Sequence, residues 1–242
     1  MSSQQELAGQ TVVVIGGSAG IGLETARQAR AEGAGVILTG RDAARLERAA
    51  SEVGALKSAA FDASDAARLE QFFDGLPAPI DHLMVTAGGP FYGRLADMDF
   101  AEAGRHVEDR IVGALRIARR ASRAVRPGGA LIFIGGVGGR RPGTGPLTMA
   151  LTAALPALVK SMALEIAPVR VNLIAPGFVD TSLSASLLGD QLEARRDHLR
   201  KTLPIRRVVG PADVAALAVH IMTNTALTGA TYDIDGGQQL VE

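Results

Sequence analysis

Three glycines near the beginning of the sequence, Gly16, Gly20 and Gly22, follow an apolar run over residues 12–15. Four β-forming residues in a row are typical of a strand that is buried on both faces, as in a parallel sheet covered by helices. The glycines let the backbone turn sharply and approach a ligand closely where the next helix begins. Because a helix N-terminus presents unpaired N–H groups and a positive dipole end, this stretch predicts a phosphate-binding loop.

The spacing G-x-x-x-G-x-G is one residue longer than the common dinucleotide motif G-x-G-x-x-G, and a tight strand-to-helix turn without a ligand would need the same glycines. The surroundings favour a dinucleotide. A helical segment follows, and the next strand, residues 35–39, ends at Gly40 and Arg41, about 20 residues past the loop, where the ribose-recognising group is expected. An acid there would bind the ribose hydroxyls of NAD, whereas an arginine offers a planar fork to a 2′-phosphate. We therefore expect NADP(H).

Further motifs follow the later strands, and together they resemble the classical short-chain dehydrogenases/reductases. The resemblance runs from about residue 8 to the C-terminus and rests on residues 16–22, Arg41, Asp62, Thr86-Ala87-Gly88, Asn172, Pro176-Gly177 and Asp235-Gly236-Gly237. Two positions depart mildly from the family pattern, since Thr86 stands where asparagine is usual and Ile15 where threonine is usual. The resemblance implies a Rossmann-like fold and hydride transfer between a nicotinamide and a carbonyl compound.

The same resemblance implies a set of cofactor-binding residues. Asp62 would accept a hydrogen bond from the adenine amine, although a loop acid that caps the next helix would look the same. The segment 176–181 would meet the nicotinamide carboxamide. The expected set is Gly16, Ser18, Ala19, Gly20, Ile21, Gly22, Arg41, Asp62, Ala63, Ala87, Gly88, Gly89, Pro176, Gly177, Val179 and Thr181.

The catalytic residues of the family are replaced. Its members use an asparagine, a serine, and a tyrosine with a lysine four residues on, because positions i and i+4 share a helix face and the ammonium lowers the pKa of the phenol. Aligned from the end of the fifth strand, these positions fall on Arg110, Gly136, Met149 and Ala153. Lys160 lies seven residues past Ala153, about 10 Å further along the helix, and cannot take the place of the lysine.

Loss of a general acid typically costs about 10²- to 10⁴-fold in rate, so carbonyl reduction of the usual kind is not expected. Two nearby residues are the remaining catalytic candidates. Tyr92 follows Gly88-Gly89-Pro90 and is either a replacement acid or an aromatic that packs on its loop. Arg110 either points inward and binds an anion or is exposed to solvent.

Two functional hypotheses follow. The first is an NADP(H)-dependent oxidoreductase of unknown substrate with an unusual active site. The second is a catalytically inactive NADP(H)-binding module that acts as a sensor or binds a partner. A lyase or isomerase on the same scaffold has no positive support in the sequence.

The elements that must position these residues alternate along the chain. We expect strands at residues 11–16, 35–39, 56–61, 80–87, 130–135, 169–174 and 231–235. Helices are expected at residues 20–32, 42–53, 65–75, 99–126, 146–167, 182–202 and 211–222. Such alternation predicts the α/β class, with a Rossmann-like doubly wound parallel sheet of about seven strands and helices on both faces. Residues 1–242 are read as a single domain, with the ligand at the carboxyl ends of the strands.

Composition excludes several classes of function. The 25 basic and 25 acidic residues balance, and tryptophan is absent, so no nucleic-acid partner is expected. Without cysteine there is no disulfide or zinc-thiolate site, and no metal site is predicted. We expect neither a signal peptide nor a membrane span, because Lys160 and Glu165 interrupt the longest apolar run, and infer a cytoplasmic protein.

The segment 99–126 repeats its apolar residues at helical spacing, and the segment 146–167 is apolar nearly all round, so that one face would cover the sheet and the other needs a partner. In the family these two helices form a subunit interface, so a homodimer or homotetramer is expected. Pro156 lies within the second segment and should kink it.

Overall fold

A sheet of seven parallel strands forms the centre of the molecule. The structure is a computed structural model that describes residues 5–140, 143 and 145–241. The strands are β1 (Thr11–Ile15), β2 (Gly35–Gly40), β3 (Lys57–Ala60), β4 (Ile80–Val85), β5 (Val125–Ile134), β6 (Arg170–Pro176) and β7 (Thr231–Ile234). Their spatial order is β3-β2-β1-β4-β5-β6-β7, which confirms the predicted doubly wound α/β fold.

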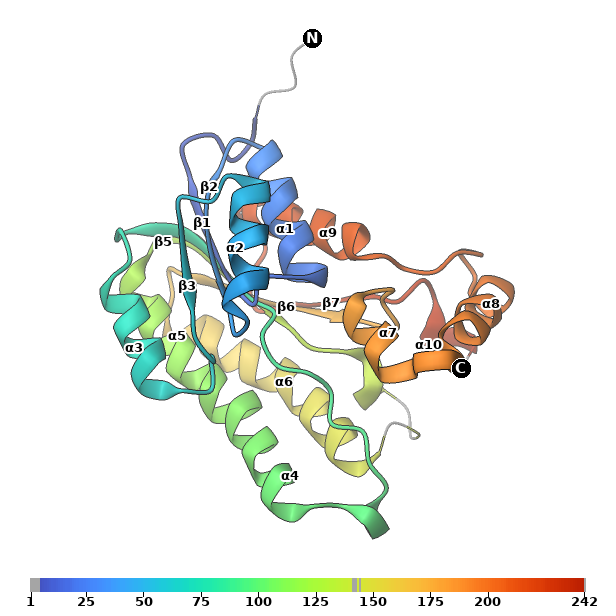
Figure 1. The fold of residues 1–242 in the computed structure, drawn as a ribbon. Coiled ribbons are helices and arrows are strands. Elements are labelled where there is room, and N and C mark those ends of the chain that lie inside the picture. The colour runs from blue at the N-terminus through green and yellow to red at the C-terminus, as the bar shows by residue number, and fades with distance from the viewer. Residues whose placement is uncertain (1–4, 141–142, 144, 242) are drawn as a thin grey trace.

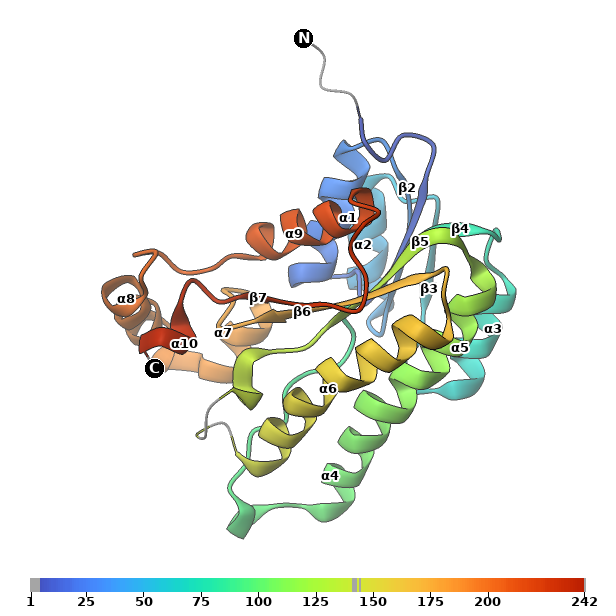
Figure 2. The same ribbon diagram turned by 180° about the vertical axis from the view of Figure 1, so that it is seen from behind.

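Helices cover both faces of this sheet (Figures 1 and 2). One layer contains α1 (Gly20–Ala31), α2 (Ala43–Val53) and α9 (Pro211–Thr223), and the other contains α3 (Ala66–Asp74), α5 (Gly113–Ala124) and α6 (Pro146–Glu165). Successive residues of a strand point to opposite faces. Val12 and Val14 accordingly belong to the core beneath α1 and α9, while Val13 and Ile15 belong to the core beneath α5 and α6.

The segment predicted as one helix over residues 99–126 is interrupted. It consists of α4 (Phe100–Val107), a π-helical turn η2 (Glu108–Val112) and α5, and β5 begins at Val125 rather than near residue 130. The early strand residue Val125 pairs with Ile80 before the regular register begins at His82. A π-turn shifts the side chains that follow it around the helix axis and is frequent at functional sites. Here it carries Arg110.

The segment predicted as a helix over residues 182–202 is also divided. Helix α7 (Ser182–Leu188) ends at Gly189, whose φ of +52° breaks the helix, and the chain continues through η4 (Gly189–Gln191) into α8 (Leu192–Thr202). Together with the short C-terminal α10 (Gln238–Val241), these helices lie beyond the end of the sheet at one side of the molecule (Figure 1). Two 3₁₀ turns, η1 (Leu95–Asp97) and η3 (Val137–Gly139), were not anticipated.

Helix α6 continues through Pro156 as one helix of 20 residues. Its length and its mean hydropathy of 1.6 would suffice for a membrane span despite Lys160, but core helices of water-soluble folds meet the same criterion. In this fold Leu155, Val159 and Met162 form a buried stripe against the sheet. Helix α6 is therefore a layer of the α/β core.

Candidate functional site

A cleft of about 660 Å³ opens where the central strands end. Its walls come from the turn between β1 and α1, the loop after β4, the end of β5, helix α6, and the segment that runs from the end of β6 into α7. Parallel strands of an open sheet place their carboxyl ends at one edge, and the chain reverses its winding direction there between β1 and β4. The cleft thus lies at the predicted ligand site.

The glycine loop is held close to the end of β4. Gly16 has a φ of +97°, and a Cβ on it would lie 2.6 Å from Thr86 Oγ1. A Cβ on Gly22 would lie 2.3 Å from the carbonyl oxygen of Gly16. Ala19 precedes α1 without a side-chain cap. The first N–H groups of α1 are therefore available to an anion at this end of the cleft.

Arg41 and Asp62 lie near each other outside the cleft. Arg41 Nη1 is 4.0 Å from Asp62 Oδ2, with the two side chains 76% and 51% exposed. Asp62 Oδ1 accepts hydrogen bonds from the backbone N–H and the hydroxyl of Ser64, and the backbone bond is the larger cause of the lowered pKa of Asp62. Asp62 is therefore an anion at neutral pH, and it leaves the Arg41 guanidinium accessible to a ligand.

The cleft brings together most, but not all, of the expected cofactor-binding residues. Lining it are Gly16, Ala19, Gly20, Ile21, Gly22, Gly88, Gly89, Pro176, Gly177, Val179 and Thr181. Five others do not line it, namely Ser18, Arg41, Asp62, Ala63 and Ala87. Ser18 is buried beneath β2, where a Cβ on Gly40 would lie 2.8 Å from its hydroxyl oxygen.

The positions expected to correspond to the family's serine, tyrosine and lysine do not converge. Gly136 lines the cleft, but Met149 lines a second hollow with Tyr92, Gly93, Arg94, Gly143, Gly145 and Pro146. Ala153 is exposed and lines neither space. Helix α6 instead presents Leu151 and two threonines to the cleft.

The threonine hydroxyls of α6 already donate to backbone carbonyl groups. Thr148 Oγ1 bonds to the carbonyl oxygen of Phe91, and Thr152 Oγ1 lies 2.7 Å from the carbonyl oxygen of Thr148. Tyr92 lines the cleft but is 60% exposed, and desolvation raises the pKa of its phenol, although the charge of Arg195 opposes the shift. Tyr92 is therefore a neutral phenol at neutral pH.

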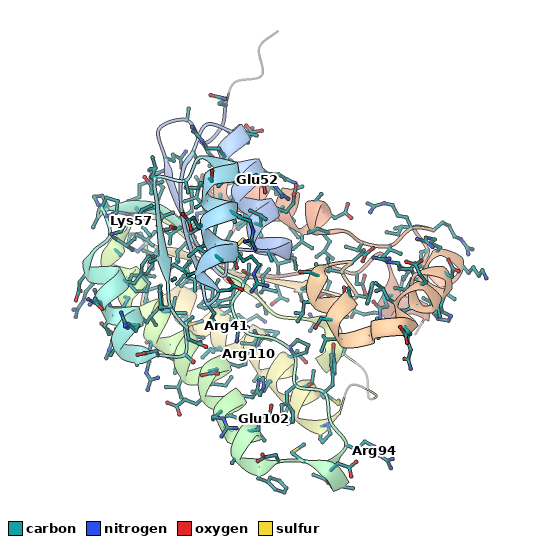
Figure 3. The ribbon with its side chains drawn as sticks, in the orientation of Figure 1. Arg41, Glu52, Lys57, Arg94, Glu102 and Arg110 are labelled. Atoms are coloured by element: carbon teal, nitrogen blue, oxygen red, sulfur yellow. The ribbon has the colours of Figure 1, made fainter. Side chains whose placement is uncertain are left out.

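Of the two orientations considered for Arg110, inward or toward solvent, the structure shows the inward one. Its guanidinium lines the cleft behind the loop after β4, with Nη1 3.5 Å from the position of a Cβ on Gly88. In Figure 3 it lies nearer the centre of the molecule than Glu102 and Arg94. Its neighbour Glu108 pairs with Arg116 at 3.2 Å instead. Burial lowers the pKa of Arg110, and in the described part of the chain no carboxylate compensates it.

Sequence reasoning did not anticipate the contribution of α10. Gln238 lines the cleft, and its Oε1 accepts a hydrogen bond of 2.9 Å from the backbone N–H of Phe178. A Cβ on Gly177 would lie 2.5 Å from that same oxygen. Gln238 lies 60 residues after Phe178 in the sequence, and no sequence motif indicates that it belongs to the site.

Comparisons with known proteins identify the family of the chain. A family model described as enoyl-(acyl carrier protein) reductase matches residues 16–239. The galactitol 2-dehydrogenase (L-tagatose-forming) of Cereibacter sphaeroides is 32% identical over 244 residues, covering 96% of this chain and 95% of the relative.

Solved structures share the fold over nearly the whole chain. The MalC reductase/Diels-Alderase of Malbranchea aurantiaca has a TM-score of 0.90 at 25% identity and covers 98% of this chain and 99% of its own. BdcA, solved in complex with NADPH, has a TM-score of 0.85 at 28% identity and covers 96% of this chain and 95% of its own. The dehydrogenase/reductase SDR family member 4 of Oryctolagus cuniculus is 30% identical over 257 residues, covering 98% of this chain and 96% of the relative. The chain belongs to the short-chain dehydrogenase/reductase family of oxidoreductases.

Proposed function

We propose that this protein is an NADP(H)-dependent oxidoreductase that acts on a small molecule without the family's tyrosine–lysine pair. The observation that carries the proposal is the close-packed glycine loop with the uncapped N-terminus of α1, which opens into a cleft large enough for a nucleotide and a substrate. The similar protein BdcA was solved with NADPH, which supports the choice of cofactor.

The residues present fit the dinucleotide. Side chains at Gly16 and Gly22 would fill the space between the loop and β4, so the backbone there is shaped for close approach. The N–H groups at the start of α1 would hold the diphosphate, Arg41 the 2′-phosphate, and Asp62 with Ala63 the adenine. Gly88 and Gly89 would border the ribose, and residues 176–181 the carboxamide. When bound, NADP(H) supplies or accepts the hydride.

Proton transfer is the step for which the cleft offers least. Its threonine hydroxyls donate to backbone groups, and Tyr92 stands at the exposed rim. Arg110 keeps its proton at neutral pH, but a guanidinium stabilises negative charge that develops on a substrate oxygen without giving a proton up. Arg110 therefore supplies positive charge to the cleft but no proton, and we assign delivery of the proton to solvent that enters past Tyr92.

Calorimetry with NADPH and NADH, followed by turnover with NADPH deuterated at C4, tests the proposal. We expect NADPH to bind more tightly than NADH, and deuterium to appear in the reduced product of at least one compound in a panel of carbonyl and unsaturated carbonyl substrates. Failure of both nucleotides to bind at millimolar concentration would overturn the proposal.

A second candidate is an inactive NADP(H)-binding module that serves as a sensor or binds a partner. It is favoured by the position of Met149 and Ala153 outside the cleft, which removes the family's proton donor from the cofactor. Tight NADPH binding with no deuterium transfer to any member of the panel would select this alternative.

We also propose that the chain associates as a homodimer or homotetramer through α4, α5 and α6. Apolar side chains are exposed on these helices, among them Val107 at 40%, Leu115 at 45% and Leu164 at 82%. Light scattering of Leu115→Glu should show a smaller particle than the wild type, whereas Leu56→Glu, at an exposed site between α2 and β3, should not. An unchanged mass for Leu115→Glu would contradict this assembly.

A further inference from the structure

Two arginines, Arg110 and Arg195, line the cleft, and none of the described residues that line it is acidic. Arg195 belongs to α8 at the outer side and stacks over the Phe178 ring at 5.9 Å. Arg110 comes from the opposite layer, on the π-turn between α4 and α5. The cleft is therefore positively charged, and its inner cation, Arg110, has no carboxylate partner in the described part of the chain.

A half-buried guanidinium without a counter-charge has lost part of its hydration and gained no ion pair in return. Burial lowers the pKa of Arg110, as this loss requires, yet an arginine remains charged at neutral pH. A bound anion would supply the missing interaction. Planar carboxylates match the guanidinium fork with two parallel hydrogen bonds.

The position of Arg110 separates it from the sites expected for the cofactor's phosphates. Those sites are the N-terminus of α1 and Arg41 after β2, whereas Arg110 lies beside Gly88 after β4. The surrounding walls are mainly apolar, with Phe91, Leu151, Phe178, Leu183, Leu187 and Leu188. A guanidinium set among apolar walls is the arrangement that recognises an acid with an apolar body.

We propose that Arg110 binds the carboxylate of a small apolar acid in this cleft, and that this carboxylate is part of the substrate. The inference rests on the proposed function for the reaction that follows binding, but binding itself can be measured without turnover. It makes Arg110 the residue that sets substrate specificity and assigns the substrates to apolar monocarboxylates.

Hexanoate and hexanamide provide the test because they differ in charge and hardly in shape. Each is titrated into the protein saturated with NADP⁺ and followed by calorimetry and ligand-observed NMR. We expect hexanoate to bind at least about tenfold more tightly than hexanamide, which corresponds to about 1.4 kcal/mol. Arg110→Met should remove this preference, and Arg110→Lys should keep part of it, because lysine retains the charge but loses the fork.

Matched variants make the result specific. Arg105→Met removes an exposed arginine from the preceding helix α4 and should bind hexanoate as the wild type does. Arg195→Met should retain most of the preference for the acid. Equal binding of acid and amide by the wild type overturns the proposal, as does an unchanged preference in Arg110→Met or a preference lost only in Arg195→Met.

Separate NADPH titrations of each variant distinguish this proposal from the proposed function. If the wild type binds hexanoate in preference to hexanamide but binds no nucleotide, the carboxylate site stands and the oxidoreductase proposal fails. If Arg110→Met loses NADPH affinity while keeping the preference for hexanoate, Arg110 is a cofactor residue and the carboxylate site is overturned.

Discussion

The hydroxyl of Thr86 donates a hydrogen bond of 2.9 Å to the carbonyl oxygen of Gly16, and lies 3.3 Å from that of Ile15. The hydroxyl oxygen of Thr86 also blocks any side chain at Gly16 and Gly22, since a Cβ on either glycine would lie 2.6 Å from it. Thr86 thus connects the end of β4 to the glycine loop. It stands where the family usually has asparagine, and its hydroxyl holds the loop at the position that the proposed cofactor requires.

Thr86→Val should destabilise the protein and weaken NADPH binding. Valine keeps the shape but leaves the Gly16 carbonyl without this donor, a loss of about 1 kcal/mol, whereas the Ile15 carbonyl still accepts from the backbone N–H groups of Thr86 and Ala87. Urea unfolding and NADPH calorimetry measure the two effects. Thr25→Val is the control, because its hydroxyl bonds to Ile21 within α1 at 2.9 Å and should affect stability alone. NADPH affinity equal to wild type in Thr86→Val would contradict a role in loop positioning.

Arg41→Ala should reduce affinity for NADPH by about tenfold or more and leave affinity for NADH nearly unchanged, because only NADPH carries the 2′-phosphate. The high exposure of Arg41 means that salt screens the interaction, so the preference should narrow as ionic strength rises. Calorimetry of both cofactors at low and high salt provides the measurement. Arg123→Ala, an exposed arginine of α5, serves as the charge-matched control. Equal losses for NADPH and NADH would mean that Arg41 does not read the 2′-phosphate.

The buried side chain of His82 makes the free energy of unfolding depend on pH. It is buried in β4, its Nδ1 accepts a hydrogen bond of 3.2 Å from Ala130 N–H, and its Nε2 lies 2.8 Å from Gln10 Oε1. Desolvation, reinforced by the charges of Arg170 and Arg126, lowers the pKa of His82 to about 3. A second proton would displace the bond from Ala130, so the folded protein holds His82 neutral.

Stability should therefore fall as the pH drops below 6.5. Between the folded pKa of about 3 and the ordinary value of 6.5, the unfolded chain binds one proton more than the folded chain, so the free energy of unfolding rises with pH in this window and levels off above it. From pH 7 to pH 5 the contribution of His82 is a loss of about 2 kcal/mol. Urea unfolding at both pH values should show that His82→Gln loses less than the wild type, whereas the exposed His220→Gln behaves as the wild type does. Identical losses in all three would contradict this assignment.

The fold was predictable because its determinants are local. The apolar runs around Val13 and Ile37 specify buried strands. The glycines Gly16, Gly20 and Gly22 specify the turn between the first strand and α1. The inward orientation of Arg110 was not, since it depends on a π-turn that helical spacing does not reveal. Nor was the exposure of Ala153, which remains exposed although η3 packs so closely on α6 that a Cβ on Gly139 would lie 2.6 Å from the backbone nitrogen of Ala153.

Restoring the family's side chains tests whether the orientation of α6 keeps positions 149 and 153 away from the nicotinamide. The variant Gly136→Ser/Met149→Tyr/Ala153→Lys recreates the serine, tyrosine and lysine in sequence. Gly136 has room for its serine, because its backbone is extended and the nearest atom to a Cβ would be the Pro176 carbonyl oxygen at 3.6 Å. Tyrosine at 149 would instead extend toward the second hollow beside Arg94, and lysine at 153 toward solvent.

We therefore expect the triple variant to bind NADPH and to reduce the carbonyl panel no faster than the wild type. A working tyrosine–lysine pair would raise kcat/KM by about 10²- to 10⁴-fold, which NADPH oxidation detects easily. Circular dichroism and NADPH calorimetry must first show that the variant folds and retains its cofactor site. Gly136→Ser alone is the control for filling the cleft. A rise of that size in the triple variant would show that α6 can turn positions 149 and 153 toward the nicotinamide, and that the wild type lacks only the side chains.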